Sequence, residues 1–387
     1  MATVLISAGD ASGDRHAAAF ARALRDRVPD VRLVGLGGEA LHEAGVELFA
    51  DRSDLAVGGI FELAGSARRV LRAWRRITQA AAELHPDLVV LVDSGGFNLP
   101  LARRVRRLGD ARVLYYVAPQ VWAWRRRRLR KIAQRVDRVA VIHPFEQDLY
   151  RTAGIAVEFV GHPLVDELVA FRADCDREEA CRRLGLDPAR RFVTLLPGSR
   201  RNEWTRHLPL ALAAARRLCA RTSDVAFLLA LAPGVDRDAV ARMIDAADLA
   251  PALRPILVHD RTWEAIRAAD VVLAKPGTVT VEAMILERPM VVIGRAHPLT
   301  AALVRRLVHV RWLAMPNLVA GRSIVPELLQ GDARPDRIAE ALAALLDREG
   351  AAAQCRALAE AAARLGPGGA ATRASAIAEA MLGAGAA

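Results

Sequence analysis

Polar side chains follow glycine turns at several points of this chain, each directly after a short apolar run. VDSGGFN places Asp93 in such a turn, and GDASGDRH, residues 9–16, adds two aspartates and His16 after an earlier run. Asp93 would face a cleft there and act as general base toward a substrate hydroxyl, with His16 as another candidate. The alternatives are aspartates that shape turns or start helices, and a histidine that is only structural. The GDASGDRH turn suits a hydroxylated ligand such as a sugar better than a phosphate, through Ser12, Gly13 and Asp14.

A third turn carries residues suited to an anion. LLPGSRRNE, residues 195–203, has Gly198 and Ser199 directly after an apolar run and before an expected helix. Glycine lets the backbone approach a ligand, and free N–H groups at a helix start favour a phosphate. Arg200 would add a bidentate clamp on that phosphate. Since every α/β protein contains such turns, an ordinary connection is the alternative.

AKPGTVTVEA, residues 274–283, repeats this arrangement with Gly277 and Thr278. Glu282 lies one helical turn beyond Thr278, where its carboxylate would accept hydrogen bonds from ribose hydroxyls. A helix cap followed by a solvated glutamate is the structural alternative. Two anion turns and an acidic residue in one domain indicate a nucleotide, although the GxxxxGK[ST] phosphate loop is absent.

Residues 63–77 form a basic amphipathic pattern. Five arginines alternate with apolar residues at helical spacing: Leu63, Ala67, Val70, Leu71, Trp74 and Ile77. Such a helix can lie on an anionic membrane, or it can be an ordinary surface helix packed on the core. Our hypothesis for lipid docking comprises Ile60, Phe61, Val70, Leu71 and Trp74.

The segment APQVWAWRRRRLRKI, residues 118–132, sets two tryptophans before a run of arginines. Trp122 heads an apolar helical stripe, whereas Trp124 is about 200° further around a helix and can face elsewhere. We expect a loop at the rim of a cleft, with Trp122, Trp124 and Arg125 on the side of the acceptor lipid, followed by a basic helix whose arginines lie near phosphorylated lipid headgroups. Core tryptophans beside a solvated basic face are the alternative. No RNA-binding signature accompanies the segment, so nucleic acid is not expected as a partner.

Apolar runs alternate with helix-type segments along the whole chain. Runs such as TVLISA, DLVVLV and RVLYYV are followed, after the polar segment that begins at GHPLVDEL, by RFVTLL, DVAFLLAL, DVVLA and PMVVIG. This alternation of apolar runs and helix-type segments predicts an α/β fold of two doubly wound domains with parallel sheets and a ligand cleft between them. The expected boundaries are 1–165, 166–350 and a helical tail over 351–387.

Composition limits the class of protein. The 387 residues suit two domains, and 53% hydrophobic residues favour a globular chain over a disordered one. No signal-peptide pattern opens the chain, no apolar run is long enough to span a bilayer, and the four cysteines form no CxxC pair. These features predict a cytoplasmic protein. The net charge of +11 suggests an anionic partner, although all basic residues except Lys131 and Lys275 are arginine, which lowers the weight of the total.

Taken together, the motifs resemble the lipid-A-disaccharide synthase family. SAGDASGD, VDSGGFN, APQVWAWRRRRLRKI, HPFE, FVGHPLVD, LLPGSRRNE, GTVTVEAM and PNLVAGRSIVPELLQ occur in the family's order from about residue 3 to about residue 345. Each motif alone is weak, but the set is specific, and VWAW and PNLVAGR separate it from other enzymes of the GT-B architecture. The resemblance implies an inverting glycosyltransferase that joins UDP-2,3-diacylglucosamine to 2,3-diacylglucosamine 1-phosphate, at the inner-membrane surface and without cofactor or metal.

Residue by residue, the resemblance gives Asp93 the role of base for the acceptor 6-hydroxyl and places Arg200 near the donor diphosphate. Glu282 and Asn317 match positions that line the UDP site. It also favours a homodimer, and a tail that crosses back onto the first domain. Another UDP-N-acetylglucosamine transferase of the GT-B type, or a non-catalytic basic protein that binds membranes or RNA, are the competing hypotheses.

The chain departs from the family pattern at three places. Asp10 stands where the family more often has glutamate, so the charge stays but the reach shortens. Ser94, Gly95 and Gly96 replace the middle of the family's DxPDFN motif, which removes a second carboxylate. Gly294 stands where a tyrosine is common, so ligand contacts expected there are in doubt.

Overall fold

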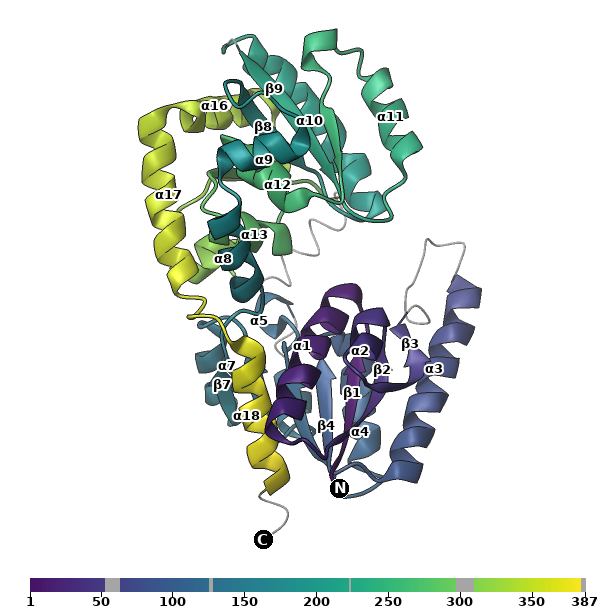
Figure 1. Cartoon of the computed structure of the whole chain (residues 1–387). Helices are drawn as coiled ribbons and strands as arrows, with labels where there is room; N and C mark the ends of the chain where they lie inside the picture. Colours follow the sequence, from purple (N-terminus) through teal and green to yellow (C-terminus); the bar gives the residue numbers. More distant parts are fainter. Residues whose placement is uncertain (53–62, 125–127, 223, 297–309, 384–387) are drawn as a thin grey trace. The chain divides into compact units, whose positions relative to one another are not determined.

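The computed structural model describes residues 1–52, 63–124, 128–222, 224–296 and 310–383, except the side chains of residues 63–67, 123 and 124 (Figure 1). Within this range the chain divides into two compact units: Met1–Pro163 with Pro367–Ala387, and Leu164–Gly366. The first division falls two residues before the expected boundary, and residues 351–366 belong to the second unit rather than to the tail. Each unit is built on one parallel sheet, which confirms the predicted α/β class.

The first unit holds a seven-stranded sheet in the order β3-β2-β1-β4-β5-β6-β7. Its elements are β1 (Thr3–Ala8), α1 (Ala11–Arg27), β2 (Arg32–Gly37), α2 (Glu39–Glu43), β3 (Glu47–Asp51), α3 (Leu63–Leu84), β4 (Leu88–Val92), α4 (Gly95–Val105), β5 (Arg112–Tyr116), α5 (Val121–Trp124), α6 (Arg128–Ala133), β6 (Arg138–Val141), α7 (Glu146–Thr152), β7 (Val157–Phe159) and α18 (Ala370–Gly383).

Alternate residues of these strands face opposite sides of the sheet. Ile6 and Val90 join a core with α1 and α18, whereas Leu5 and Val89 join a core that includes Ile77 of α3. Because both faces are covered, the strands read as continuous apolar runs rather than as alternating ones, as a doubly wound sheet requires.

Helix α18 completes the first of these cores. It lies along α1, as Figure 1 shows for the yellow and purple helices, and contributes Ala374, Ile377, Ala378 and Met381. Arg27 Nε lies 2.7 Å from Glu379 Oε2 at the edge of this contact. The C-terminal helix is therefore a structural part of the first unit.

The second unit holds a six-stranded parallel sheet in the order β10-β9-β8-β11-β12-β13. Its elements are α8 (Leu164–Asp174), α9 (Arg177–Leu184), β8 (Arg191–Leu196), α10 (Arg201–Cys219), β9 (Val225–Leu231), α11 (Arg237–Ala246), η3 (Pro251–Leu253), β10 (Ile256–His259), α12 (Thr262–Ala268), β11 (Val271–Ala274), α13 (Thr278–Ile285), β12 (Met290–Gly294), α15 (Met315–Ala320), β13 (Glu327–Leu329), η4 (Gln330–Asp332), α16 (Pro335–Leu346) and α17 (Arg348–Ala363).

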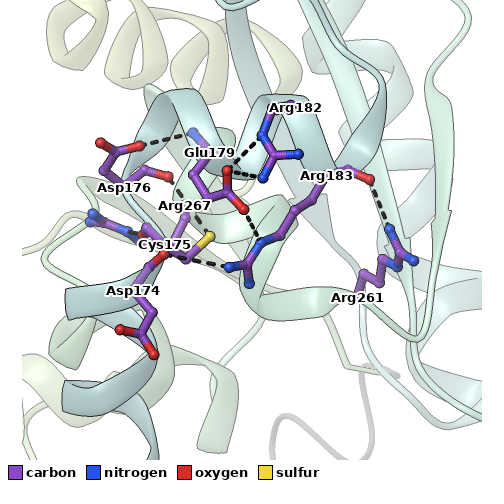
Figure 2. A network of polar contacts seen from close by, with 8 residues as sticks. All are labelled: Asp174, Cys175, Asp176, Glu179, Arg182, Arg183, Arg261 and Arg267. Atoms are coloured by element: carbon purple, nitrogen blue, oxygen red, sulfur yellow. Dashed lines mark hydrogen bonds and ion pairs between the residues drawn. The ribbon is translucent and has the colours of Figure 1, made fainter.

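A polar network joins α8, α9 and α12 (Figure 2). Arg267 Nε donates to the carbonyl of Cys175 at 2.8 Å, and its Nη1 donates to the carbonyl of Leu286 at the end of α13 at 3.2 Å. Arg183 Nε donates to Glu179 Oε1 at 2.6 Å within α9. The network therefore fixes the C-terminal end of α13, the helix whose first residues were predicted to bind an anion.

Candidate functional site

Asp93 lies where the strand order of the first sheet reverses. Strands β1 and β4 are neighbours, and their carboxyl ends lead into Asp10 and Asp93. Ser94 joins these two residues: its Oγ donates to Asp10 Oδ2 at 3.1 Å, and its N–H donates to Asp93 Oδ1 at 2.7 Å. Among the described residues, no donor reaches the other oxygen of Asp93. This is the edge at which doubly wound sheets bind their ligands.

The backbone at Asp93 and Ser94 is strained. Both residues have positive φ, 46° and 44°, in the left-handed region that costs energy for side chains with a Cβ. The Asp93 carbonyl accepts hydrogen bonds from Tyr115 Oη at 2.6 Å and from Asn98 Nδ2 at 2.9 Å. These buried donors hold the turn, and so they fix the direction of the Asp93 carboxylate.

The surroundings of Asp93 favour its neutral form more than water does. Burial, followed by the charge of Asp10, raises the pKa of Asp93 to about 6, and the hydrogen bond from the Ser94 N–H opposes this only partly. A base whose pKa lies just below the working pH is ionised and still holds a proton well. Asp93 therefore combines position and basicity for accepting a proton from a hydroxyl group.

His16, the other candidate base, is half-buried on α1. Burial and the neighbouring Arg15 lower the pKa of His16 to about 4, although Asp10 raises it. At neutral pH the imidazole is uncharged, so it can accept a hydrogen bond but holds a proton less well than Asp93.

The residues expected to contact a sugar are mostly engaged within the first unit. Ser12 Oγ donates to Asp10 Oδ1 at 2.9 Å, and the N–H of buried Gly13 donates to the same oxygen at 2.7 Å, which caps α1. Asp14 is buried, accepts from the Gly38 N–H at 2.6 Å and lies 3.5 Å from Arg52 Nε. Asp14 thus anchors the loop before α2.

Trp122 is buried rather than exposed at a rim. Its Nε1 donates to Glu146 Oε1 at 2.9 Å, and its ring meets Phe145 edge to face with centroids 5.2 Å apart. Glu146 Oε2 also accepts from the His143 N–H at 3.1 Å. Burial raises the pKa of Glu146 to about 8, against the hydrogen bonds from His143 and Trp122. The VWAW and HPFE motifs therefore form one buried structure, whereas the Trp124 side chain and Arg125 lie outside the described residues.

Helix α3 presents most of its predicted polar face to solvent. Arg72 and Arg75 are exposed, and Leu71 on the same helix keeps 47% of its surface exposed. Val70 is half-buried, as is Trp74, which packs edge to face on Phe97 with centroids 5.4 Å apart. Ile60 and Phe61 lie outside the described residues. None of the described helices is long and apolar enough to cross a membrane.

The second unit has its polar cluster at the equivalent place. Strands β8 and β11 are neighbours where the strand order reverses, and the turns at Gly198 and Gly277 follow them. Both glycines have positive φ, 121° and 149°, so these turns require glycine. The Arg200 side chain is 80% exposed, and its Nη1 lies 3.8 Å from Glu203 Oε1.

Two of the N–H groups expected to bind phosphate have a partner within the chain. Those of Ser199 and Arg200 donate to Glu203 Oε2 at 3.1 and 3.3 Å. Lys275 Nζ lies 3.0 Å from the other oxygen of this carboxylate. Burial alone would raise the pKa of Glu203, but Lys275 and the Arg200 N–H lower it below its usual value.

Thr278 opens α13 and is exposed, whereas Glu282, four residues on, is half-buried. Asn317 is buried, and its amide is engaged within the second unit. Its Oδ1 accepts from the Ile324 and Val325 N–H groups at 2.6 and 2.9 Å, and its Nδ2 donates to Glu327 Oε1 at 2.7 Å. Asn317 lies on α15 (Met315–Ala320) and therefore holds the loop that follows the PNLVAGR motif.

Sequence reasoning missed several residues of these clusters. Tyr115 and Asn98 hold the Asp93 turn, Glu146 holds Trp122, and Lys275 joins the two anion turns. The signal for Lys275 was present, since it is a rare lysine in an arginine-rich chain. In the described ranges, no three His, Cys, Asp or Glu side chains gather as metal ligands would.

Solved structures define the class to which these two units belong. The MurG protein of Acinetobacter baumannii is similar over 98% of this chain and 100% of its own, with a TM-score of 0.59 and 14% identity. A UDP-GlcNAc 2-epimerase from Neisseria meningitidis is similar over 98% of this chain and 99% of its own, with a TM-score of 0.62 and 11% identity. The fold is the GT-B architecture, as predicted.

Sequence comparisons give the family. A family profile described as Lipid-A-disaccharide synthetase matches residues 4–380. The lipid-A-disaccharide synthase of Syntrophus aciditrophicus is 45% identical over 89% of this chain and 88% of its own. The lipid-A-disaccharide synthase of Geobacter sulfurreducens is 40% identical over 98% of this chain and 97% of its own. The chain belongs to the lipid-A-disaccharide synthetase family and is a glycosyltransferase that condenses lipid A precursors. This assignment confirms the resemblance and decides against the competing hypotheses.

Proposed function

We propose that the chain transfers 2,3-diacylglucosamine from UDP-2,3-diacylglucosamine to 2,3-diacylglucosamine 1-phosphate. Asp93 accepts the proton of the acceptor 6-hydroxyl as its oxygen bonds to the anomeric carbon of the donor. The bond from that carbon to the diphosphate oxygen breaks, and its electron pair leaves with UDP. Attack opposite the leaving group inverts the configuration and gives the β(1→6) disaccharide 1-phosphate. The observation that carries this proposal is the Asp93 carboxylate at the β1–β4 switch point, with a pKa of about 6.

In this proposal the second unit binds the nucleotide. Exposed Arg200 contacts the diphosphate, with Gly198 and Ser199 shaping its turn. The start of α13 at Gly277 and Thr278 adds the positive end of a helix dipole, and Glu282 accepts from the ribose. Preorganised positive groups of this kind stabilise the charge that develops on the leaving diphosphate. The first unit holds the acceptor lipid, with Asp93 as its base.

The test is the release of UDP from UDP-2,3-diacylglucosamine, measured with and without the monosaccharide 1-phosphate acceptor. We expect acceptor-dependent release by the wild type, and a loss of roughly a hundredfold or more in Asp93→Asn, as for removal of a general base. Release that persists in the variant would move the base elsewhere, with His16 next. No release by the wild type with either lipid present would refute the proposed substrates.

We also propose that α3 docks on an anionic membrane surface, which would make the protein peripheral to the inner membrane on its cytoplasmic side. Exposed Leu71 among exposed arginines supports this, since basic amphipathic helices bind anionic lipid through both parts. Ile60 and Phe61 belong to the same hypothesis by their place in the sequence. The resemblance also leads us to propose a homodimer, which light scattering would show as twice the 41.8 kDa of one chain.

Co-sedimentation with vesicles of anionic phospholipid tests the docking surface. Leu71→Glu should lower the bound fraction several-fold, because it places a negative charge against the lipid surface. Ile256→Glu is the matched control, since Ile256 is 41% exposed on β10 of the second unit. Equal recovery of both variants and the wild type would mean that α3 does not dock.

A further inference from the structure

Lys275 lies between the two glycine turns of the second unit. Its Nζ is 3.0 Å from Glu203 Oε1, although the two residues are 72 positions apart. A Cβ atom placed on Gly277 would lie 3.0 Å from that Nζ, and one on Gly198 would lie 2.6 Å from Glu203 Oε2. Both turns therefore pack directly on the Lys275–Glu203 pair, whose side chains are only 20% and 16% exposed.

The identity of the residue is informative. Of the 55 basic residues in this chain, all but Lys131 and Lys275 are arginine. Lysine carries its charge on a compact ammonium group, whereas the planar guanidinium of arginine is broader and directs its donors in a fixed fork. The ammonium lies 3.0 Å both from Glu203 Oε1 and from the place that a Cβ on Gly277 would take, so a compact cation suits this position.

The Glu203 carboxylate takes the place that an anion would otherwise occupy in the Gly198 turn. It accepts from the N–H groups of Ser199 and Arg200, so it holds the turn in shape but also sets a negative charge beside the proposed diphosphate position. Unbalanced, that charge would repel a second anion. Lys275 offers the compensation, because its ammonium contacts the same carboxylate directly.

We propose that Lys275 is a positioning residue for the nucleoside diphosphate of the donor. It neutralises Glu203, which in turn fixes the Arg200 turn, and it joins this turn to the start of α13. The proposal rests on the proposed role of the second unit in nucleotide binding and adds a pair of residues to it. Lys275 acts through Glu203 and not by contact with the ligand.

The experiment measures UDP binding to the full chain by calorimetry, together with KM for each substrate. Lys275→Met should raise the Kd for UDP about tenfold or more, because it leaves the Glu203 charge uncompensated. The KM for the nucleotide sugar should rise in parallel, with the KM for the lipid acceptor unchanged. Lys131→Met, which removes the exposed lysine of α6, is the matched control and should bind UDP like the wild type.

The double variant Lys275→Met with Glu203→Gln decides the mechanism. Removing the carboxylate removes the repulsion while the amide oxygen still accepts from the turn, so most of the lost affinity should return. The double variant also avoids an unpaired charge, which guards against misfolding. If affinity stays low in the double variant, Lys275 contacts the diphosphate itself and the positioning role is refuted. A lower Tm with unchanged Kd in Lys275→Met would also refute it. Failure of the wild type to bind UDP would instead refute the proposed function.

Discussion

The two switch points share one architecture and carry opposite charge. At the first, between β1 and β4, Asp10 and Asp93 lie close enough for one carboxylate to raise the pKa of the other. At the second, between β8 and β11, Arg200 and Lys275 both lie within 4 Å of the Glu203 carboxylate. The fold thus supplies a ligand site at the carboxyl ends of the strands in each unit. The residues of the turns decide whether that site can accept a proton or bind an anion.

The backbone of the two turns differs as well. Gly198 and Gly277 adopt positive φ at little cost, whereas Asp93 and Ser94 adopt it against their Cβ atoms. The strained turn needs the hydrogen bonds of Tyr115 and Asn98 to persist, and it holds a side chain that must point in one direction. The glycine turns offer close backbone approach instead, which a bound phosphate group requires.

The strongest test of this comparison is one substitution at each switch point, with UDP affinity and turnover measured for both variants. Arg200→Ala should raise the Kd for UDP by about ten- to a hundredfold, because a charge-assisted contact with phosphate disappears. Asp93→Asn should leave that Kd within about twofold, even though turnover falls by roughly two orders of magnitude. Calorimetry with UDP separates the two effects. A large loss of UDP affinity in Asp93→Asn would contradict the division of labour.

The pH dependence of turnover sharpens the same point. Since the pKa of Asp93 is raised to about 6, kcat/KM should fall about tenfold for each unit of pH below 6, where the carboxyl is protonated. The KM for the nucleotide sugar should change much less over that range, because arginine and lysine keep their charge and a doubly esterified diphosphate has no group that titrates there. Initial rates at several concentrations of the nucleotide sugar, measured from pH 5 to pH 8, test this. A flat rate profile would mean that Asp93 is not the base.

Glu146 gives the first unit a second response to pH. Its pKa is raised from 4.5 to about 8 in the folded chain, so the unfolded chain releases the proton first as the pH increases. The stability that the neutral carboxyl contributes is therefore present below pH 4.5 and lost as the pH rises to about 8. Glu146→Gln keeps an oxygen acceptor for Trp122 and should raise Tm at pH 8 by a few degrees, with little change near pH 4.5. An equal shift at both pH values would contradict this.

At His207 we expect the smallest effect on thermal stability, with a pH dependence opposite to that at Glu146. Its Nε2 accepts from the Arg295 N–H at 3.1 Å, and burial lowers the pKa of this histidine in the second unit. A histidine that is neutral when folded loses its contribution to stability as the pH falls through the range around 6.5. The Tm difference between wild type and His207→Gln should be larger at pH 8 than at pH 5. Thermal unfolding at both pH values gives the comparison, and a difference that grows toward pH 5 would count against it.

Much of the fold could be predicted because its central strands are buried on both faces. Apolar runs such as residues 88–92 and 271–274 mark the strands, and the turns after them mark the site edge. The edge strands escaped detection. Glu47–Asp51 and Glu327–Leu329 begin with an acidic residue and are only partly buried, so they lack a continuous apolar run. Edge strands need less burial, and their sequences are correspondingly less distinctive.

The candidate site was less predictable wherever a partner lies far away in the sequence. A motif shows that Asp14 and Trp122 are unusual, but not that one caps the loop at Gly38 and the other donates to Glu146. Both were expected near a ligand, and both are buried in the first unit. Asn317 shows the same limit, because its place in a motif cannot distinguish a side chain that contacts a ligand from one that shapes the loop.

The position of α18 has a consequence for synthesis of the chain. Its side chains fill the core beside α1, yet they leave the ribosome only after every residue of the second unit. The second unit can therefore fold while the core beside α1 still lacks Ala374, Ile377, Ala378 and Met381 of α18. During that interval the nascent first unit exposes an apolar surface, the kind that chaperones protect and that aggregation exploits.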